Sequence, residues 1–199
     1  MTTKEKILFE ALSQFSVKGY SSVSIRDIAY AVGIKESSIY NHYVNKQAIF
    51  DEIILFCQNR ASQQYELLNL QETFKGNFDV YEHIPPQVLL TISKTMFNFY
   101  VSDEYLRKFR QMLTIEQYNN AHIAVIYKDT FIDQPIQFQT LLFQHLILTG
   151  SLHNANPKAL ALEFYAPIFL LLCRYDSLED ASELLNIHIN HFIQKNSKI

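Results

Sequence analysis

The chain contains little glycine and proline, with four Gly and five Pro among 199 residues. That is too few for the many tight turns of a β-rich fold, so we expect a mostly helical protein. Charged residues are also scarce, at 19%, whereas hydrophobic residues make up 48%. This balance excludes a disordered chain and allows a substantial core, because enough apolar surface can be buried.

Long hydrophobic runs are absent as well. The longest apolar run, around 166–173, contains Pro167 and is far shorter than the roughly 18 residues of a membrane span. The N-terminal stretch MTTKEKILFEALSQF interleaves charges with apolar residues and lacks the apolar centre of a signal peptide. We therefore expect a cytoplasmic protein that does not contact a membrane.

Residues that usually build metal or catalytic sites are few and scattered. Cys57 and Cys173 have no CxxC partner, which favours reduced thiols packed among apolar side chains. His188 and His191 are three residues apart, but no carboxylate or cysteine lies near them in sequence to complete a metal site. No glycine-rich phosphate loop or nucleophile elbow is present. We expect no metal, no cofactor, no catalytic residue and therefore no enzyme.

Charge of one sign does not dominate. The net charge of −3 at first argues against nucleic acid as a partner. Residues 1–60, however, hold seven basic and six acidic side chains, whereas residues 61–199 hold ten basic and fourteen acidic ones. This mild asymmetry permits DNA binding at the N-terminal end without indicating it.

A helical pattern begins near the N-terminus. Apolar residues recur every three to four positions and form one stripe, made of Ile7, Leu8, Ala11, Leu12 and Phe15. Gly19 suits the position after that helix, where a positive φ costs glycine nothing. Ser24 and Asp27 then form a capping-box pattern, which predicts the start of a second helix.

Residues 24–43 have the pattern of a helix-turn-helix. The second helix buries Ile25, Ile28 and Ala29 and ends at Gly33, and a third helix is predicted from about Lys35 to Tyr43. Ala29 is small enough for two helices to cross closely. The third helix then exposes short polar side chains suited to base edges and phosphates: Glu36, Ser37, Ser38, Asn41 and His42. The plainer alternative is a pair of helices in a bundle that does not bind DNA.

Residues 7–50 resemble the DNA-binding domain of the tetracycline-repressor (TetR) family. The matching residues are Ile7, Ala11, Phe15, Gly19, Ser24, Ile28, Ala29, Gly33, Ile39, Tyr40, His42, Tyr43 and Lys46. The match covers the first quarter of the chain, and the rest agrees with the family only in length and helical character. The resemblance implies an all-α fold, with a three-helix DNA-binding domain at 1–46 and a larger helical effector-binding and dimerisation domain at 47–199.

The resemblance also implies roles for individual residues. Tyr40, His42 and Lys46 would contact phosphates, and Ser24 and Arg26 would approach the DNA backbone. The major groove would be faced by Glu36, Ser37, Ser38 and Asn41.

Three positions complicate this picture. The family often has a capping serine where Lys35 stands, and Lys35 could reach a phosphate instead. The family often has glycine where Ser37 stands, so the approach to DNA could differ slightly. Glu36 would be repelled by phosphates unless it accepts from a cytosine amino group.

The larger domain is expected to hold an effector. A fourth helix, capped by Asn45 and running over about 46–70, would link the domains, and further helices are expected near 86–101, 103–116, 118–131, 135–152, 157–174 and 178–195. Aromatic residues there fit core packing, but together they could line an apolar cavity. We predict that cavity within 85–150, with four residues as candidate contacts to a small apolar or aromatic effector: Phe97, Phe109, Met112 and Tyr118.

Two apolar stripes could make a homodimer. They are formed by Phe138, Leu141, Leu142, His145, Leu146 and Thr149, and by Leu162, Ala166, Phe169, Leu170 and Cys173. Each stripe could instead face the core of its own chain. Together with the resemblance, the sequence predicts a dimeric transcriptional repressor that binds double-stranded DNA at a palindromic operator and is released by a ligand. The alternative is a helical scaffold or protein-binding module that has lost DNA binding.

Overall fold

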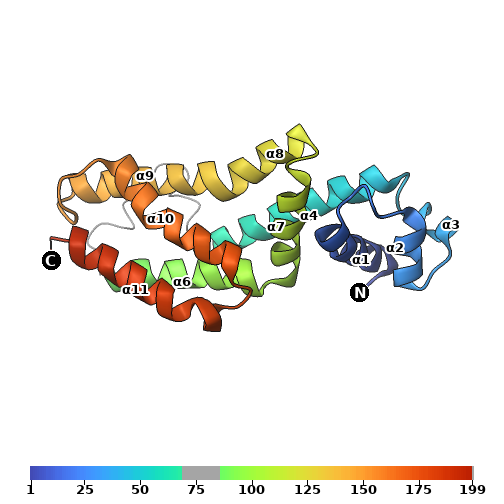
Figure 1. Cartoon of the computed structure of the whole chain (residues 1–199), viewed down its shortest axis with the longest axis horizontal. Coiled ribbons are helices and arrows are strands. Elements are labelled where there is room, and N and C mark those ends of the chain that lie inside the picture. Colours follow the sequence, from blue (N-terminus) through green and yellow to red (C-terminus); the bar gives the residue numbers. More distant parts are fainter. Residues whose placement is uncertain (69–85, 199) are drawn as a thin grey trace. The chain divides into compact units, whose positions relative to one another are not determined.

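The computed structural model describes residues 1–68 and 86–198, and every element named in them is a helix (Figure 1). The predicted all-α fold is confirmed. In order, the elements are α1 (Thr3–Lys18), α2 (Ile25–Val32), α3 (Glu36–Ile39), α4 (Lys46–Leu67), α6 (Pro86–Ser102), α7 (Glu104–Glu116), α8 (Ala121–Lys128), the π-helix η2 (Asp129–Asp133), α9 (Gln134–Leu148), α10 (Pro157–Arg174) and α11 (Leu178–Asn196).

Most helices lie within a few residues of their predicted limits. The fourth helix begins as predicted, since Asn45 Oδ1 accepts from the Ala48 N–H at 2.8 Å and caps α4. The predicted connection at 71–86 falls almost entirely outside the described residues. No helix in the described parts of the chain is both long enough and apolar enough to cross a bilayer.

The chain forms two compact units. The first consists of Met1–Gln63 and Glu104–Tyr127, and the second of Gln64–Asp103 and Lys128–Ile199. The chain therefore passes from one unit to the other three times. One of these passages lies inside the continuous helix α4.

The first unit has its core between α1 and the helices packed on it. All five predicted stripe residues of α1 are buried, as are Ile28, Ile39, Ile49 and Ile53. Helix α1 starts with a capping box that was not predicted: Thr2 Oγ1 accepts from the Glu5 N–H, and Glu5 Oε2 accepts from the Thr2 N–H. Helix α7 packs against α1 in the same unit.

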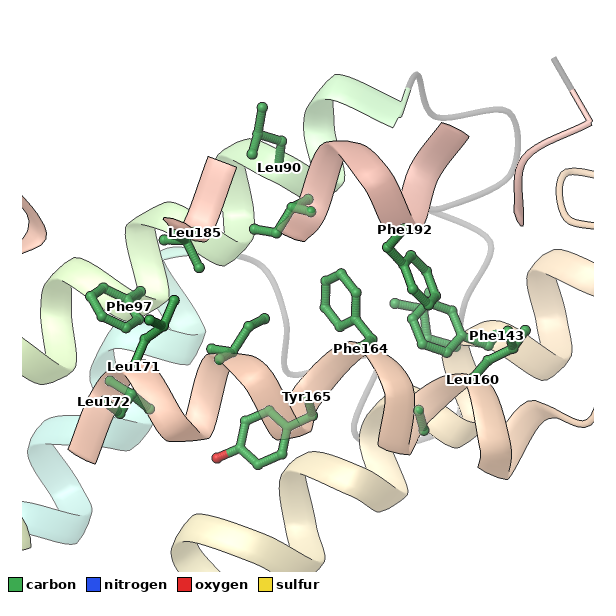
Figure 2. Close-up of a cluster of buried hydrophobic side chains, with 14 of the residues drawn as sticks. Leu90, Phe97, Phe143, Leu160, Phe164, Tyr165, Leu171, Leu172, Leu185 and Phe192 are labelled. Carbon is green, nitrogen blue, oxygen red and sulfur yellow. The ribbon is translucent and has the colours of Figure 1, made fainter. Parts of the chain in front are cut away.

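The second unit is built around α10, which packs against α6, α9 and α11 (Figure 1). Its core contains three phenylalanines that meet in edge and tilted contacts (Figure 2). The ring centroids of Phe143 and Phe164 are 5.5 Å apart, and those of Phe164 and Phe192 are 4.8 Å apart. Such aromatic contacts fix side-chain geometry more tightly than aliphatic packing alone.

The predicted break at 133–135 is wrong, because helix η2 joins α8 to α9 without a loop. A proline in an α-helix cannot donate to the carbonyl four residues earlier, and its ring clashes with that carbonyl. For Pro135 this carbonyl belongs to Phe131. The wider π turn, in which the Gln134 N–H donates to Asp129 O, relieves this clash. The Phe131 carbonyl, which has no N–H of Pro135 to accept from, accepts from the Tyr165 hydroxyl at 2.8 Å.

Candidate functional site

The start of α2 is fixed by hydrogen bonds between neighbours in sequence. The predicted capping box is present: Ser24 Oγ accepts from the Asp27 N–H at 3.1 Å, and Asp27 Oδ2 accepts from the Ser24 N–H at 2.8 Å. The Ser24 hydroxyl also donates to Asp27 Oδ2 at 2.6 Å, and this bond, followed by the bond from the Ser24 N–H, holds the pKa of the Asp27 carboxyl below its usual value. The carboxylate also lies in the positive first turn of the helix.

The turn between α2 and α3 depends on Gly33. This glycine has φ 77° and ψ 32°, the left-handed conformation that side chains with a Cβ disfavour. Its N–H donates to Tyr30 O at 3.1 Å, and the Ile34 N–H donates to Ala29 O at 3.0 Å. This pair of bonds is the Schellman motif, which ends α2 and turns the chain toward α3.

Helix α3 is shorter than the predicted 35–43. Lys35, at its N-cap, makes no side-chain capping bond, as expected from its lack of an acceptor. The helix ends at Ile39, and the His42 N–H then donates to Ile39 O in a tighter turn. Ile39 itself is fully buried and anchors this segment to the first unit.

The structure leaves the predicted DNA-contacting edge accessible. Tyr40, on the turn after α3, has 53% of its surface exposed. Ser38 and Lys46 are partly buried, and the other predicted contacts are all exposed: Ser24, Arg26, Lys35, Glu36, Ser37, Asn41 and His42. Burial of Ile28, Ala29 and Ile39 beneath them gives these polar side chains a fixed base. The arrangement can present a short polar edge to a groove of duplex DNA.

Lys46 has a structural role that the sequence did not reveal. Its ammonium donates to Tyr20 O at 2.8 Å and to Val23 O at 2.6 Å. The same ammonium lies 4.2 Å from the centroid of the Tyr20 ring. An ammonium has three N–H donors, so one is left over for a DNA phosphate. Phosphate binding by Lys46 stays a prediction. The hydrogen bonds of Lys46 to the α1–α2 turn are a second, structural role of the same side chain.

The backbone of Tyr20 is also held by Glu116, the last residue of α7. The Tyr20 N–H donates to Glu116 Oε1 at 2.7 Å, and Glu116 has only 5% of its surface exposed. Burial, together with the carboxylates of Asp51 and Glu116, raises the pKa of the Tyr20 phenol. These residues lie far apart in sequence, so no local pattern could have indicated the contact. It ties α7 to the turn that precedes α2.

A cavity of about 130 Å³ lies in the second unit. Its walls come from the end of α4, from α6, from η2 and α9, and from α10. Most of the lining is apolar, including Ile92, Met96, Phe97, Phe131, Phe138 and Leu142. A concave, mostly apolar space with a few polar groups is the usual form of a small-molecule site.

The cavity is crossed by a pair of phenols. Tyr65, near the end of α4, and Tyr100, on α6, share a hydrogen bond of 2.7 Å between their hydroxyl oxygens. Burial raises the pKa of both phenols, and for Tyr100 the neighbouring Tyr65 raises it further. Both side chains are therefore neutral at physiological pH and can exchange hydrogen bonds with a ligand.

The four predicted ligand contacts are not brought together. Phe97 lines the cavity, but Phe109 and Met112 lie in the core of the first unit with 2% and 0% of their surface exposed. Tyr118 is 85% exposed and lies away from the cavity lining. Phe109, Met112 and Tyr118 therefore do not line this cavity, contrary to the prediction. Helical periodicity identifies buried positions, but it does not tell which of two cores a side chain enters.

The two predicted dimer stripes differ in exposure. On α9, Leu142 and Leu146 are buried in the core of their own unit. On α10, Ala166 and Cys173 are exposed, and Leu162 and Leu170 have 55% and 64% of their surfaces exposed. A further exposed apolar pair, Leu184 and Ile187, lies on α11. Helix α9 exposes Leu141 and Leu148, with 39% and 79% of their surfaces accessible, but the other apolar members of its predicted stripe are buried or partly buried. The larger group of exposed apolar side chains lies on α10 and α11.

Within residues 1–68 and 86–198, no group of three His, Cys, Asp or Glu side chains is placed to share a metal ion. His188 and His191 have different surroundings. His188 Nε2 lies 2.7 Å from the Phe164 carbonyl oxygen, within hydrogen-bond distance, and His191 is exposed.

Comparisons with known proteins agree with the geometry of the N-terminal helices. The family model for "Bacterial regulatory proteins, tetR family" matches residues 7–53. The Staphylococcus epidermidis protein IcaR, a negative transcriptional regulator of the biofilm operon icaADBC, is 32% identical over 148 residues. That alignment covers 68% of this chain and 79% of IcaR.

Solved structures extend the similarity to the whole fold. PfmR from Thermus thermophilus has a TM-score of 0.66 at 17% identity, covering 97% of this chain and 96% of that chain. SmeT in complex with triclosan has a TM-score of 0.64 at 19% identity, covering 100% of this chain and 93% of that chain. SmeT is the repressor of a multidrug efflux pump of Stenotrophomonas maltophilia. The family model, the relative and the shared fold agree, and the chain belongs to the tetR family of bacterial regulatory proteins, which are DNA-binding transcriptional regulators.

Proposed function

We propose that the chain is a dimeric repressor that acts in the cytoplasm, binds a palindromic operator through α3, and is released when a small apolar molecule enters the cavity. The observation that carries the proposal is the exposed polar edge over residues 35–42, held on the buried base of Ile28, Ala29 and Ile39. IcaR is a negative regulator and SmeT is a repressor, and SmeT forms a complex with triclosan. These relatives support repression and ligand binding in this chain.

The DNA-binding part is tested by gel shift on the DNA upstream of the protein's own gene, over a series of salt concentrations. We expect a shift that weakens as salt rises, because phosphate contacts release counterions. Tyr40→Ala combined with Asn41→Ala should abolish the shift while the protein remains folded. Tyr118→Ala removes another exposed tyrosine outside the DNA-contacting edge and should change nothing. A folded protein that gives no shift at any salt concentration would favour the scaffold alternative.

Dimerisation is proposed through the exposed apolar faces of α10 and α11. One recognition helix reads few bases, so pairing two copies multiplies both contacts and specificity. A second copy of the chain would cover Leu162, Leu170 and Ile187, each of which has more than half of its surface exposed. Leu170→Glu should shift the mass in solution from dimer to monomer. Leu148→Glu is the matched control, since Leu148 is 79% exposed on α9 outside the proposed face.

Helix α4 is proposed as the coupling element. It carries Lys46 at its start, where the ammonium holds two carbonyls of the α1–α2 turn, and Tyr65 near its end, where the side chain lines the cavity. A ligand that favours one position of Tyr65 would therefore act on the helix that also holds this turn. Such a ligand lowers operator affinity to the extent that it prefers the state that does not bind DNA.

A further inference from the structure

The backbone of Tyr20 is held by two helices at once. The ammonium of Lys46, the first residue of α4, donates to the Tyr20 carbonyl at 2.8 Å. The carboxylate of Glu116, the last residue of α7, accepts from the Tyr20 N–H at 2.7 Å. Tyr20 lies between α1 and α2, so the relative placement of α4 and α7 sets the geometry of the turn that leads into α2.

The other ends of the same two connections lie in the cavity wall. Tyr65 is near the end of α4, and Tyr100 is near the end of α6, which is followed by α7 after a single intervening residue. Both side chains line the cavity and are partly exposed. Their hydroxyl oxygens are 2.7 Å apart, so one hydrogen bond joins α4 to the helix that leads into α7.

Between these ends, α4 and α7 touch each other through Tyr105, near the start of α7. The ring centroid of Tyr105 lies 4.9 Å from that of Phe56 and 5.4 Å from the Arg60 guanidinium. Phe56 is about halfway along α4 between Lys46 and Tyr65, roughly 14 Å from each at about 1.5 Å of rise per residue. Because helices are stiff, a change in the spacing of α4 and α7 on one side of this contact is passed to the other side.

We infer that Tyr100 is a positioning residue for DNA binding, whose hydrogen bond to Tyr65 fixes the spacing of α4 and α7 and, through it, the α1–α2 turn. The inference rests on the proposed function, since it names the contact through which the cavity regulates operator binding. A molecule in the cavity that displaces either phenol breaks the bond. Because such a molecule is the one that releases the operator, the bond belongs to the DNA-binding state, and its loss favours the other state.

The first test is operator affinity, measured by gel shift with the full chain carrying Tyr65→Phe, Tyr100→Phe or both. Each single substitution keeps the ring and removes one hydroxyl of the pair. We expect each to weaken operator binding at least about fivefold, the size of one net hydrogen bond. Tyr100→Phe should have no further effect in the Tyr65→Phe background, because the bond is already lost there.

Tyr165→Phe is the matched control. It also removes a buried phenol hydrogen bond of the second unit, the 2.8 Å bond to the Phe131 carbonyl. That bond joins α10 to η2 and involves neither α4 nor α6. All variants are compared at a temperature where circular dichroism shows them to be folded. We expect Tyr165→Phe to lower the melting temperature, as Tyr100→Phe does, and to leave operator affinity unchanged.

A second test reads the α1–α2 turn without DNA. The exchange rate of the Tyr20 amide hydrogen, followed by NMR, reports how firmly Glu116 holds it. We expect this exchange to be several-fold faster in Tyr100→Phe than in the unmodified chain, and unchanged in Tyr165→Phe. A role of Tyr100 confined to the cavity would not alter an amide of the first unit.

The inference is overturned if Tyr65→Phe and Tyr100→Phe leave operator affinity unchanged, if their effects multiply in the double variant, or if Tyr165→Phe weakens binding equally. It is also overturned if Tyr20 exchange is the same in Tyr100→Phe and in the unmodified chain. The unmodified chain separates this inference from the proposed function. If it binds no operator, the proposed repressor is removed, whereas operator binding together with unchanged Tyr20 exchange removes only the role of Tyr100.

Discussion

The predicted DNA-contacting edge and the cavity are built in opposite ways. The edge is made of the side chains of residues 35–38 and 40–42, which are all exposed except the partly buried Ser38. The hydrogen bonds that shape this segment join residues close in sequence. The cavity is lined by side chains from α4, α6, α9 and α10, and its key polar contact joins Tyr65 to Tyr100. The difference suggests that a DNA-reading surface can be specified locally, whereas a ligand site depends on how distant segments pack.

The largest expected effect is a loss of folding stability in the second unit that leaves operator binding unchanged. Phe143→Ala removes a fully buried ring from the core of the second unit and should lower the free energy of unfolding by about 3–5 kcal/mol. At a temperature where the variant is still folded, its operator affinity should remain near that of the unmodified chain. Thermal denaturation and gel shift measure the two quantities. Leu148→Ala, at an exposed position, should change the unfolding free energy by no more than about 0.5 kcal/mol.

The next effect compares two glycines. Gly19 has φ 78° and ψ 159°, and a Cβ there would lie 2.9 Å from Glu116 Oε1, whereas a Cβ at Gly33 would meet nothing within 4 Å. We expect Gly19→Ala to destabilise the chain by about 3 kcal/mol, and Gly33→Ala by about 1 kcal/mol from the left-handed backbone alone. Chemical denaturation measures both. Gly19 also has a ψ that residues with a Cβ adopt even less readily than the left-handed conformation of Gly33. Equal losses would mean that neither this backbone difference nor the Glu116 contact adds to the cost.

Substitutions of Lys35 and Lys46 distinguish a side chain predicted only to contact DNA from one that also stabilises the fold. Lys35→Gln should leave the unfolding free energy unchanged and reduce the slope of log affinity against log salt concentration by about one, as expected for one lost phosphate contact. Lys46→Gln should reduce both stability and affinity, because two backbone carbonyls of the α1–α2 turn lose their donor. If Lys46→Gln changes only the salt slope, the hydrogen bonds to Tyr20 and Val23 are not important for stability.

The smallest effect is a pH dependence at the start of α2. Hydrogen bonds from Ser24 lower the pKa of Asp27 in the folded chain, so the carboxylate form stabilises the fold. That stabilisation is complete above the ordinary carboxyl pKa of about 4 and is lost as pH falls through the lowered folded value. Asp27→Asn should remove this part of the acid dependence. Helicity followed by circular dichroism between neutral and acid pH would show whether the two profiles diverge only at the acid end.

Much of the N-terminal fold could be predicted because its signals are local. The Ser24–Asp27 box, the positive φ of Gly19 and Gly33, and the buried stripe of α1 each depend on residues at most eight positions apart. The ten predicted DNA-contacting positions are all at least partly exposed. Their individual contacts with DNA remain predictions.

Predictions from the sequence were wrong where a feature depends on residues that are distant in sequence. The sequence predicts buried apolar positions at Phe97, Phe109 and Met112, and all three are buried. Only Phe97 lines the cavity. The break predicted at Pro135 was replaced by a π turn, because the Tyr165 hydroxyl could take the carbonyl that proline leaves without its usual donor. Nothing in the sequence near Pro135 indicates that partner.

The sequence by itself determined the helical class, the glycine-turned helix pair and the polar edge that follows it, because hydrogen bonds and side-chain periodicity act over a few residues. Only the tertiary structure decided which aromatic side chains line the cavity and that Glu116 and Lys46 hold the backbone of Tyr20 from both sides. These features arise between segments many residues apart. Their geometry is set by the packing of whole helices, which no short stretch of sequence encodes.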